Sequence, residues 1–478
     1  MNLQYNRRKI IQIIVIVAVG TFMGALDSSI VNISLPAISG YFSVTLTTVE
    51  WVVLSYLIII TSLLLAFGRL GDLYGHKKIY NIGFMVFTAG SLACALSPSI
   101  ILLIASRALQ AVGAGMLMSM GPAIITANTP PGDRGKSLGT IAVSVSVALI
   151  IGPVLGGFLT SYLGWQSIFY VNIPIGIGMS IWAARALPST RPEGTVSFDF
   201  IGAALLFTAL IAVIFPLSYA DKIGWKNPYI IACFLTGIVL LAVFIIVEIR
   251  VKNPMLDLKL FKNRLFSMSN LSLMFNFIAQ FCVTLIMPFY LIQLREFSPS
   301  KSGLILISAP LVVMMVAPLA GFISDKIDAR YISSAGMFLA SAGLFLLSTL
   351  NENTKIYIMV IYLAVVGLGI GFFQTPNNSA IMGSVSQNRR GLASAMIAAM
   401  RNLGMVLGVA VSGSVFSSRF NYLSQILTLQ NISDLELKNQ AFSGALKTTF
   451  IVAGIISSTA IFTSLIRGSL SPKNNNGN

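Results

Sequence analysis

The stretch IIQIIVIVAVGTFMGALDSSIVNISLPAI, residues 10–38, decides the class of fold. It follows the basic residues 7–9 and is longer than the roughly 20 apolar residues that cross the hydrocarbon core of a bilayer. One acid, Asp27, interrupts it. A charge at the centre of such a helix costs about 2.5–3.5 kcal/mol, so an ionisable residue there indicates a partner or a function. We therefore predict an uncleaved first membrane helix that carries a functional carboxylate.

Composition extends this interpretation to the whole chain. Of its 478 residues, 56% are hydrophobic and only 10% are charged, whereas a soluble protein carries about 25% charged residues. Long apolar stretches recur, which favours membrane helices over a barrel. The net charge of +16 comes from short basic loops, not from a soluble basic face, so we expect no nucleic-acid partner. The three cysteines and one histidine offer neither a disulfide framework nor a metal cluster. We expect no cofactor.

Fourteen spans are predicted, an even number that puts both termini on one side. They cover residues 10–35, 47–67, 79–97, 99–127, 137–161, 165–184, 200–219, 228–247, 266–292, 303–323, 331–349, 356–377, 393–416 and 446–466. Loops on the side of the termini hold 21 of the 31 Lys and Arg residues, including Arg467, and loops on the other side hold 8. The positive-inside rule then places both termini in the cytoplasm.

Two segments of the chain are repeated. GRLGDLYGHKK at 68–78 is matched by GFISDKIDAR at 321–330, which is 253 positions on and pairs Asp72 with Asp325. RGKSLGTIAVSVSVALIIGPVLGG at 134–157 is matched by RGLASAMIAAMRNLGMVLGVAVSG at 390–413, 256 positions on. Many secondary transporters are built from two such halves, with the substrate site between them.

The repeat predicts the domain organisation. We expect a six-helix half over residues 1–187, two inserted helices with linkers over 188–262, a second six-helix half over 263–470 and a disordered tail over 471–478.

Asp27 and Arg107 are the candidate proton-coupling residues. Every other acidic residue can be placed at or beyond the end of a span. At 1.5 Å per residue, both side chains lie about 12 Å below the outer face, so an ion pair or relay is feasible. Gln110, one turn from Arg107, would extend the polar patch. The alternative is a purely structural Asp–Arg pair.

A second group of residues is expected to control opening and closing. Gly139 and the run GPVLGG in span 5 permit close helix approach and bending, although plain packing explains most glycine-rich helices. The loop 68–78 combines glycines, an acid that can cap a helix N-terminus and basic residues, and we interpret it as a structured latch, the alternative being an ordinary positive-inside loop. The candidate gating residues are Gly68, Asp72, Gly75, Lys77, Arg134, Gly139, Gly152, Pro153, Gly156 and Gly157.

The candidate substrate-binding residues start from span 9. Asn276, Gln280 and Thr284 are spaced i, i+4, i+8, which stacks three polar groups on one helix face among aromatic residues. That face suits a cavity for a greasy ligand, although a Phe-rich helix is as often simply lipid-facing. The full candidate set is Trp51, Tyr56, Gln110, Asn276, Gln280, Phe281, Thr284, Tyr290, Phe373, Gln374, Asn378 and Arg401.

These motifs together resemble the fourteen-helix drug:proton antiporter family of the major facilitator superfamily. LDSSIVNISLP (26–36), RALQAVGAG (107–115), WQSIFYVNIPIG (165–176) and RNLG (401–404) are similar to its marks, as are the loop 68–78 and the glycines of span 5. The resemblance covers nearly the whole chain. In the loop, Leu73 and His76 stand where the family usually has arginines, and spans 10 and 13 lack the acids that some relatives carry for dicationic drugs.

The resemblance implies a major facilitator fold of two six-helix repeats plus two inserted helices. It implies export of hydrophobic or cationic drugs by alternating access, with Asp27 exchanging the proton and Arg107 tuning it. It also implies that Asp72 and its loop latch the cytoplasmic gate against Arg134. We expect a monomer in the bilayer of a bacterial cytoplasmic membrane. A dedicated exporter of one metabolite, antibiotic or lipid-like molecule is the alternative. A channel or sensor is a different class, and the sequence shows no paired catalytic carboxylates or activated nucleophile that would indicate an enzyme.

Overall fold

The computed structural model of the chain describes residues 7–130, 132–189, 200–251, 258–324, 326–430 and 433–468. The predicted tail 471–478, much of the predicted linkers on either side of the inserted helices, and Asp325 lie outside these ranges. All the regular secondary structure assigned within these ranges is helical. The chain is all-α, as predicted.

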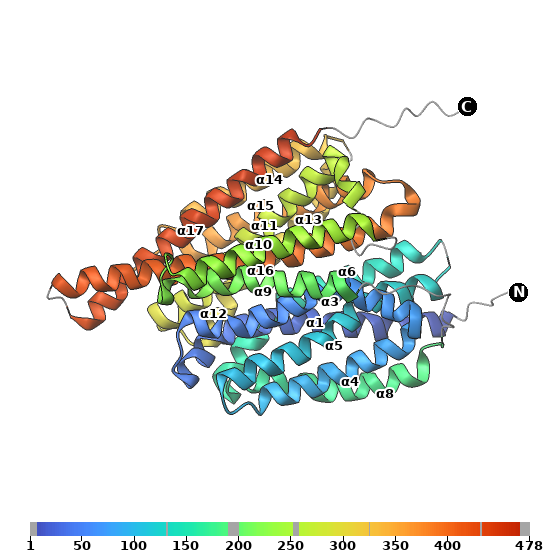
Figure 1. Cartoon of the computed structure of the whole chain (residues 1–478), viewed down its shortest axis with the longest axis horizontal. Helices are drawn as coiled ribbons and strands as arrows, with labels where there is room; N and C mark the ends of the chain where they lie inside the picture. The colour runs from blue at the N-terminus through green and yellow to red at the C-terminus, as the bar shows by residue number, and fades with distance from the viewer. Residues whose placement is uncertain are drawn as a thin grey trace, which may run out of the picture. The chain divides into compact units, whose positions relative to one another are not determined.

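Contacts group the chain into two compact units (Figure 1). Unit 1 comprises Met1–Met255 together with Met287–Ile307. Its elements are α1 (Arg7–Phe42), α2 (Leu46–Val49), α3 (Trp51–Tyr74), α4 (His76–Ala95), α5 (Ile100–Asn128), α6 (Arg134–Leu163), α7 (Ser167–Tyr170), α8 (Asn172–Ala186), α9 (Phe200–Ile223), α10 (Pro228–Arg250), the π-helical turn η2 (Tyr290–Leu294) and α12 (Pro299–Leu306).

Unit 2 comprises Leu256–Ile286 together with Ser308–Asn478. Its elements are η1 (Leu258–Lys262), α11 (Arg264–Phe289, of which the last three residues belong to unit 1), α13 (Ser308–Ser324), α14 (Ala329–Leu347), α15 (Ile356–Gly383), η3 (Gln387–Arg389), α16 (Arg390–Leu427), η4 (Thr428–Gln430) and α17 (Asp434–Ile466). In this unit α14 lies beside both α15 and α17.

Each predicted span overlaps one helix of the described chain or two consecutive ones. Thirteen helical segments of the described chain are long and apolar enough to cross a membrane. The more polar α4, with 20 residues, takes the place of the third predicted span. Short helices that follow one another directly, such as α2 and α3, make up single predicted spans.

Helix starts show the expected local chemistry. The Ser99 hydroxyl accepts a hydrogen bond from the backbone N–H of Leu102 at 3.3 Å and thereby caps α5. At α10, the Asn227 side chain accepts from the N–H of Tyr229 and Pro228 occupies the first helical turn. These caps satisfy backbone donors that have no partner inside a helix.

The largest errors in the predicted boundaries are at spans 13 and 14. Spans 13 and 14 were predicted to end at 416 and start at 446, but α16 continues to Leu427 and α17 starts at Asp434. Ser433 caps α17 by accepting from the N–H of Glu436 at 3.3 Å, and Phe416 contacts Phe442 edge-on at 4.9 Å. The polar composition of this segment hid two helices that are stabilised by pairing with each other.

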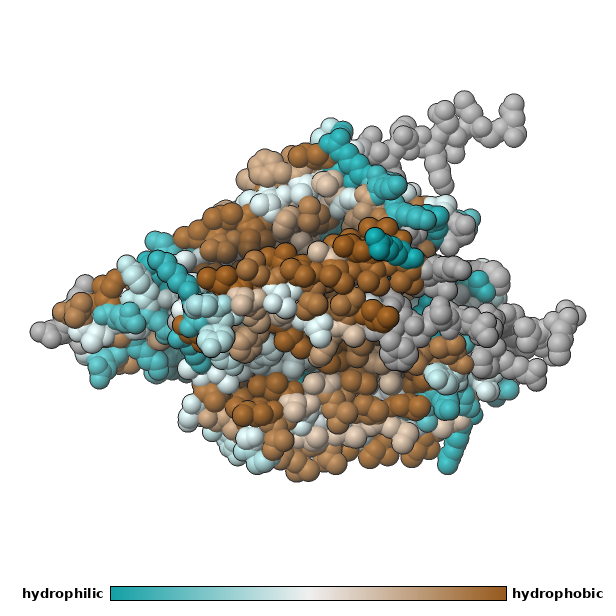
Figure 2. Space-filling model, in the orientation of Figure 1, coloured by the Kyte–Doolittle hydropathy of each residue, from teal (hydrophilic) through white to brown (hydrophobic). Residues whose placement is uncertain are grey.

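Apolar side chains cover the flanks of the helices, and polar residues gather near helix ends (Figure 2). On α10, for example, Ile238, Val239 and Ile249 are 48–67% exposed. Such continuous exposure is typical of helices in contact with lipid. The inserted helices α9 and α10 contact each other, and α9 also contacts α3, so both belong to unit 1.

Candidate functional site

Asp27 lies in the core of unit 1, fully buried on α1. Arg107, on α5, is 1% exposed, and its Nη1 forms an ion pair with Oδ2 of Asp27. The prediction that these two side chains meet is confirmed. Residue 107 reaches residue 27 because α5 lies directly beside α1.

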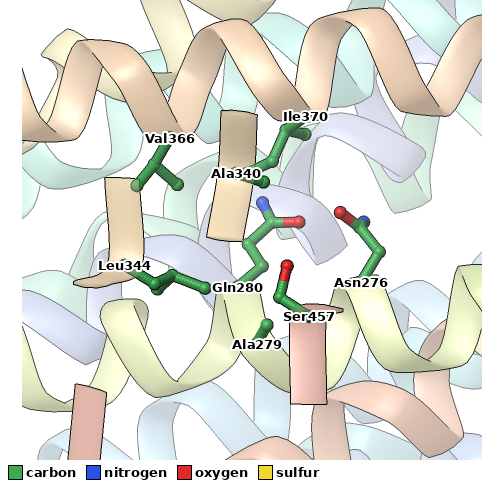
Figure 3. A pocket seen from close by; sticks show the side chains of 8 residues that line it. All are labelled: Asn276, Ala279, Gln280, Ala340, Leu344, Val366, Ile370 and Ser457. Atoms are coloured by element: carbon green, nitrogen blue, oxygen red, sulfur yellow. The ribbon is translucent and has the colours of Figure 1, made fainter. Parts of the chain in front are cut away.

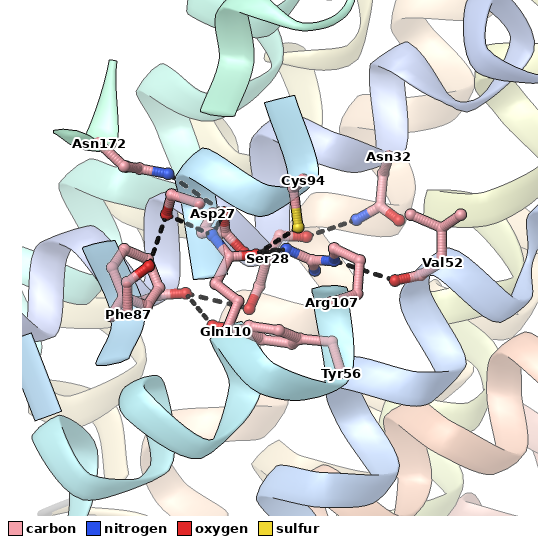
Figure 4. A network of polar contacts seen from close by, with 12 residues as sticks. Asp27, Ser28, Asn32, Val52, Tyr56, Phe87, Cys94, Arg107, Gln110 and Asn172 are labelled. Carbon is pink, nitrogen blue, oxygen red and sulfur yellow. Dashed lines mark hydrogen bonds and ion pairs between the residues drawn. The ribbon is translucent and has the colours of Figure 1, made fainter. Parts of the chain in front are cut away.

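The second carboxylate oxygen of Asp27 is also bound (Figure 4). Gln110 Nε2 donates to Oδ1 at 2.8 Å, and Asn172 Nδ2, at the start of α8, donates to the same atom at 3.2 Å. Gln110 in turn donates to the Ser91 hydroxyl of α4 at 2.9 Å and accepts from Arg107 Nη1 at 2.6 Å. Four helices therefore contribute to one hydrogen-bonded network around the carboxylate.

Arg107 makes further contacts on the side facing α3. Its Nε donates to the carbonyl oxygen of Val52 at 3.0 Å, and its guanidinium carbon lies 4.1 Å from the centre of the Tyr56 ring. The Tyr56 hydroxyl donates to the carbonyl of Gly24 at 3.2 Å, which returns to α1. Because a desolvated guanidinium is attracted to an aromatic face, Tyr56 stabilises the cation.

Sequence reasoning missed two members of this network, Ser91 and Asn172. Asn172 belongs to WQSIFYVNIPIG, a segment already singled out as a family mark, so that segment was the signal available for it. Nothing in the sequence around Ser91 distinguishes it from other serines in the spans.

The span 9 candidates are divided by the structure. Asn276 and Gln280 line a small cavity in unit 2, while the Thr284 hydroxyl bonds to the Gln280 carbonyl of its own helix at 3.1 Å. Phe281 is 8% exposed and packs against Gly408 of α16. Tyr290, in the π-helical turn, is fully buried.

The remaining substrate candidates of unit 2 lie on α15 and α16. Phe373 is fully buried, with its backbone against Gly336 of α14. Gln374, Asn378 and Arg401 are half-buried. Oδ1 of Asn378 and Nε of Arg401 have no hydrogen-bond partner among the described residues. Their role in binding stays a prediction.

Trp51 lies against the first inserted helix. Its ring centre is 6.3 Å from that of Phe215 and 6.4 Å from that of Tyr219, both on α9. Lys222 Nζ of α9 also donates to the Thr45 hydroxyl, just before α2, at 2.9 Å. Trp51 thus helps to hold α9 on unit 1.

The span 5 glycines differ in their surroundings. A Cβ on Gly156 would lie 2.7 Å from the Ile30 side chain and 2.8 Å from its carbonyl oxygen, and one on Gly152 would overlap Ser29. A Cβ on Gly157 would overlap the backbone of Pro299 in α12, and Pro153 meets Gly303 in the same contact. Around Gly139, by contrast, nothing lies within 4 Å of an added Cβ. The GPVLGG run therefore brings α6 into backbone contact with α1 and α12.

The loop motif takes a different form from the one predicted. Asp72 lies inside the last turn of α3 and so cannot cap α4; the chain turns at Gly75, whose φ of +91° favours glycine. Asp72 pairs with His76 at 3.3 Å and Arg69 at 3.9 Å. Arg134 Nε instead donates to the Thr129 carbonyl at 3.3 Å. Asp72 and Arg134 therefore each bind a group other than the partner predicted for it. Gly68 has open space around it, and Lys77 lies in the first turn of α4.

Asp27 is not alone among buried acids. Glu50, at the junction of α2 and α3, is fully buried, and Glu248, near the end of α10, is 2% exposed. Both lie near span ends in the sequence, as predicted, but packing encloses their carboxylates. The buried acids of the described residues therefore include Glu50 and Glu248 as well as Asp27. In the described ranges no cluster of three or more His, Cys, Asp or Glu residues could hold a metal ion.

Arg467 is also misplaced by sequence reasoning, which assigned it to an exposed basic loop. It is 2% exposed, and its Nη1 donates to Asn377 Oδ1 on α15 at 2.9 Å. Longer contacts of 3.5 Å reach the hydroxyls of Ser269 on α11 and Ser333 on α14. Burial lowers the pKa of Arg467 to about 10, so the side chain still carries its charge at neutral pH.

The family model described as Major Facilitator Superfamily matches residues 17–199 and 199–409. The chain belongs to the major facilitator superfamily. It is 35% identical over 414 residues to the riboflavin transporter RibZ of Clostridioides difficile (strain 630), a match that covers 86% of this chain and 89% of the relative. It is 32% identical to the multidrug resistance protein Stp of Mycobacterium tuberculosis (strain CDC 1551 / Oshkosh), covering 86% of this chain and 77% of that protein.

Among solved structures, a bacterial homolog of the human lysosomal transporter Spinster superposes with a TM-score of 0.70 at 14% identity, covering 98% of this chain and all of the other. That likeness shows the fold. Together with the apolar helices, these matches show a multi-pass membrane transporter of the major facilitator superfamily, in a family of transporters and not of enzymes.

Proposed function

We propose that this transporter is a proton-coupled antiporter that exports hydrophobic or cationic compounds by alternating access, with Asp27 as the proton-binding group. We propose also that it works as a monomer without a cofactor in a bacterial cytoplasmic membrane, with both termini in the cytoplasm. One observation carries the proposal: a fully buried carboxylate on α1 whose two oxygens accept hydrogen bonds from α5 and α8.

Protonation of Asp27 would change the contacts that hold α1 to α5 and α8. Ionised Asp27 balances Arg107 and accepts from Gln110 and Asn172, which ties α1 to α5 and α8. A proton on the carboxylate removes that balance, and an uncompensated buried cation is costly. Arg107 then has to find another partner or water, so α1 must shift or the site must open. Gly152 and Gly156 of α6 pack closely against α1. A shift of α1 would therefore also move α6.

A driving force of sufficient size is available. One elementary charge crossing 100 mV is worth about 2.3 kcal/mol, so an exchange that moves net charge can use the membrane potential. An electroneutral exchange would use the pH gradient alone.

A second candidate function is dedicated transport of a single metabolite, in particular a planar uncharged one such as a flavin. Two observations favour it. The 35% identity to a protein named riboflavin transporter spans most of both chains. Moreover, the charge of Asp27 is already balanced by Arg107, so the substrate need not supply a positive charge.

The central test measures substrate-driven proton flux in proteoliposomes, comparing wild type with Asp27→Asn. We expect Asp27→Asn to lose uphill transport and coupled proton movement while still exchanging substrate down its gradient. Glu352→Gln, the same chemical change on an exposed loop residue, is the control and should behave as wild type. Uphill transport by Asp27→Asn at the wild-type rate would refute the assignment of the proton site.

The substrate is tested separately. The same vesicles are loaded with a fluorescent cationic dye or with riboflavin, and counterflow of each is measured with the other as competitor. Dye efflux with broad competition supports a multidrug exporter. Riboflavin counterflow that the dye does not inhibit supports the dedicated transporter.

A further inference from the structure

Helix α3 makes contacts on two different sides. The carbonyl oxygen of Val52 accepts a hydrogen bond from Nε of Arg107 at 3.0 Å, and the ring of Tyr56 lies 4.1 Å from the guanidinium carbon (Figure 4). We call these two the arginine-binding groups of α3. The ring of Trp51, by contrast, lies against two aromatic residues of α9. Trp51 and Tyr56 are five residues apart, which at 3.6 residues per turn directs their side chains about 140° apart.

The contact with α9 lies at the start of α3. The ring centres of Phe215 and Tyr219, 5.0 Å apart on α9, lie 6.3 and 6.4 Å from that of Trp51. Beyond the rings, Lys222 Nζ donates to the Thr45 hydroxyl, just before α2, at 2.9 Å. Aromatic pairs at such distances stabilise a structure beyond the area that they bury. The first inserted helix thus fixes the position of the first turn of α3.

The arginine-binding groups keep their attraction for Arg107 when Asp27 is protonated. Both groups are uncharged, so their contacts with the guanidinium do not depend on the charge of the carboxylate. Arg107 is only 1% exposed, and desolvation strengthens both kinds of contact. A buried cation without a partner is costly. The two groups are therefore placed to stabilise Arg107 in the state in which Asp27 is neutral.

We propose that the first inserted helix positions the arginine-binding groups of α3, and that these groups hold the charge of Arg107 while Asp27 carries the proton. This inference rests on the proton-coupling role proposed above for Asp27. It makes Trp51 a positioning residue, whose side chain acts on Arg107 through the neighbouring Val52. It also gives the inserted pair a function, since α9 supports α3 and α10 packs along α9.

The matching position of unit 2 is uncharged. At the 253-residue offset of the repeat, the counterpart of Asp27 is Gln280. Gln280 lines a small cavity with Asn276, Ser457 and apolar side chains, and none of the lining residues is charged (Figure 3). The inserted helices belong to unit 1, whose core holds the buried ion pair. The insert therefore accompanies the charged member of the repeat.

Other ionisable groups lie near the ion pair. Tyr56 and the Cys94 thiol of α4 interact with its guanidinium, and both side chains are uncharged in their usual forms at neutral pH. Glu50 is fully buried at the start of α3, where it interacts with Tyr219 of α9. A measurement of proton uptake must therefore separate Asp27 from Glu50.

Weakening the support from α9 should make Asp27 harder to protonate. If α3 no longer holds Arg107, the cation depends more on the ionised carboxylate, and a higher proton concentration is needed to neutralise that carboxylate. Tyr56→Leu removes the aromatic face, and the loss of a desolvated cation–π contact corresponds to a fall of about one unit in the pH midpoint of protonation. Trp51→Leu removes the contact with α9, and an aromatic pair of ordinary strength corresponds to a fall of about 0.5 unit.

The infrared carbonyl band of protonated carboxyl groups measures this midpoint in the purified full-length protein without a substrate. The difference between wild type and Asp27→Asn identifies the part of the band that belongs to Asp27. The midpoint of that part is then compared among wild type, Trp51→Leu and Tyr56→Leu. We expect both variants to have lower midpoints than wild type, with the larger fall in Tyr56→Leu.

Matched variants separate positioning from a general loosening of the fold. Trp51→Phe keeps an aromatic ring against α9 and should retain the wild-type midpoint. Phe234 on α10 is 36% exposed, and Phe234→Leu should also leave the midpoint unchanged. Phe215→Leu weakens the contact from the side of α9 and should lower the midpoint as Trp51→Leu does, so the test holds even if Trp51→Leu fails to fold.

The outcomes that overturn the proposal are distinct from failure of the proton site itself. A wild-type or higher midpoint in any of the folded variants Trp51→Leu, Phe215→Leu and Tyr56→Leu overturns it. So does an equal fall in Trp51→Phe or Phe234→Leu, because the effect would then not come from the aromatic contact with α9. If Asp27→Asn removes no titrating part of the band, the assignment of Asp27 as the proton-binding group fails as well.

Discussion

Asp27 on α1 and Arg107 on α5 form an ion pair whose side chains are fully buried and 1% exposed, respectively, in the core of unit 1. A pair enclosed this completely is a weak source of stability, since apolar residues of similar volume are often as stable or more so. The presence of two buried charges on apolar helices is what makes the pair a candidate for proton coupling.

Breaking the pair from one side should destabilise the protein more than removing both charges. Arg107→Gln leaves a buried carboxylate uncompensated, at a cost of about 3–5 kcal/mol. The double variant Asp27→Asn/Arg107→Gln should recover most of the lost Tm in detergent while still lacking uphill transport. If the double variant is as unstable as Arg107→Gln, the two charges are not coupled as described.

Replacing Asn172 should weaken proton coupling at the Asp27 carboxylate and leave the stability of the fold nearly unchanged. Asn172→Leu removes the 3.2 Å donation to Asp27 Oδ1 but keeps the volume. A hydrogen bond to a charged group contributes about 1.5–3 kcal/mol, so we expect uphill transport to fall roughly tenfold or more. Ser180 also lies on α8, and its hydroxyl donates a part-buried hydrogen bond to Asn81 Oδ1 on α4. The Ser180→Ala variant, which loses this bond, serves as control. Equal losses in both variants would indicate a general effect on α8.

The span 5 glycines should separate into tight and loose positions. Gly156→Ala places a methyl group 2.7–2.8 Å from Ile30, and overpacking of this kind costs about 1–3 kcal/mol. Gly139→Ala meets nothing within 4 Å and exchanges glycine for a better helix former, so its Tm should equal or exceed that of wild type. Thermal unfolding of both variants checks the difference. A Gly156→Ala variant with wild-type Tm and transport would contradict the close contact of α6 with α1.

Trp51 should behave as a docking residue for α9. Trp51→Leu and Tyr219→Leu each remove one side of the aromatic contact at 6.4 Å, worth about 0.5–1.5 kcal/mol beyond the buried area. We expect both to lower Tm by a similar amount and to leave the substrate concentration for half-maximal transport unchanged. A change of that concentration in Trp51→Leu alone would support the predicted role of Trp51 in substrate binding.

Arg467 should stabilise unit 2 despite its position at the end of the last helix. Arg467→Ala leaves the side-chain amide oxygen Oδ1 of Asn377 without its 2.9 Å donor and opens a cavity, and an unsatisfied buried acceptor costs about 1–3 kcal/mol. Its pKa, lowered by burial to about 10, keeps the residue charged between pH 6 and 8, so its contribution should not vary with pH there. Above pH 10 the folded state releases the proton more readily than the unfolded state, so stability should rise with pH. Thermal unfolding at pH 6, 7 and 8 checks the flat region.

Several parts of the molecule followed directly from the residue pattern. Asp27 was identified because a carboxylate in hydrocarbon is expensive, and Arg107 because a second charge occurs at equal depth in another span. The positions of the apolar helices followed from apolar length, and the glycines of GPVLGG from the need of membrane helices for close contact. All of these are local or periodic properties, which a linear chain displays before it folds.

Other features arise only when distant segments meet. Ser91 and Asn172 become partners of the site because α4 and α8 lie beside α5 and α1, and no spacing along the chain records that neighbourhood. Glu50 and Arg467 lie at helix ends, where sequence reasoning expects exposure, yet neighbouring helices enclose them. The sequence alone therefore decided which segments are apolar and long enough to cross a membrane, because hydrophobicity and rise per residue are local. Tertiary packing decided which polar side chains face each other, because burial and hydrogen bonding depend on helices that are far apart in the chain.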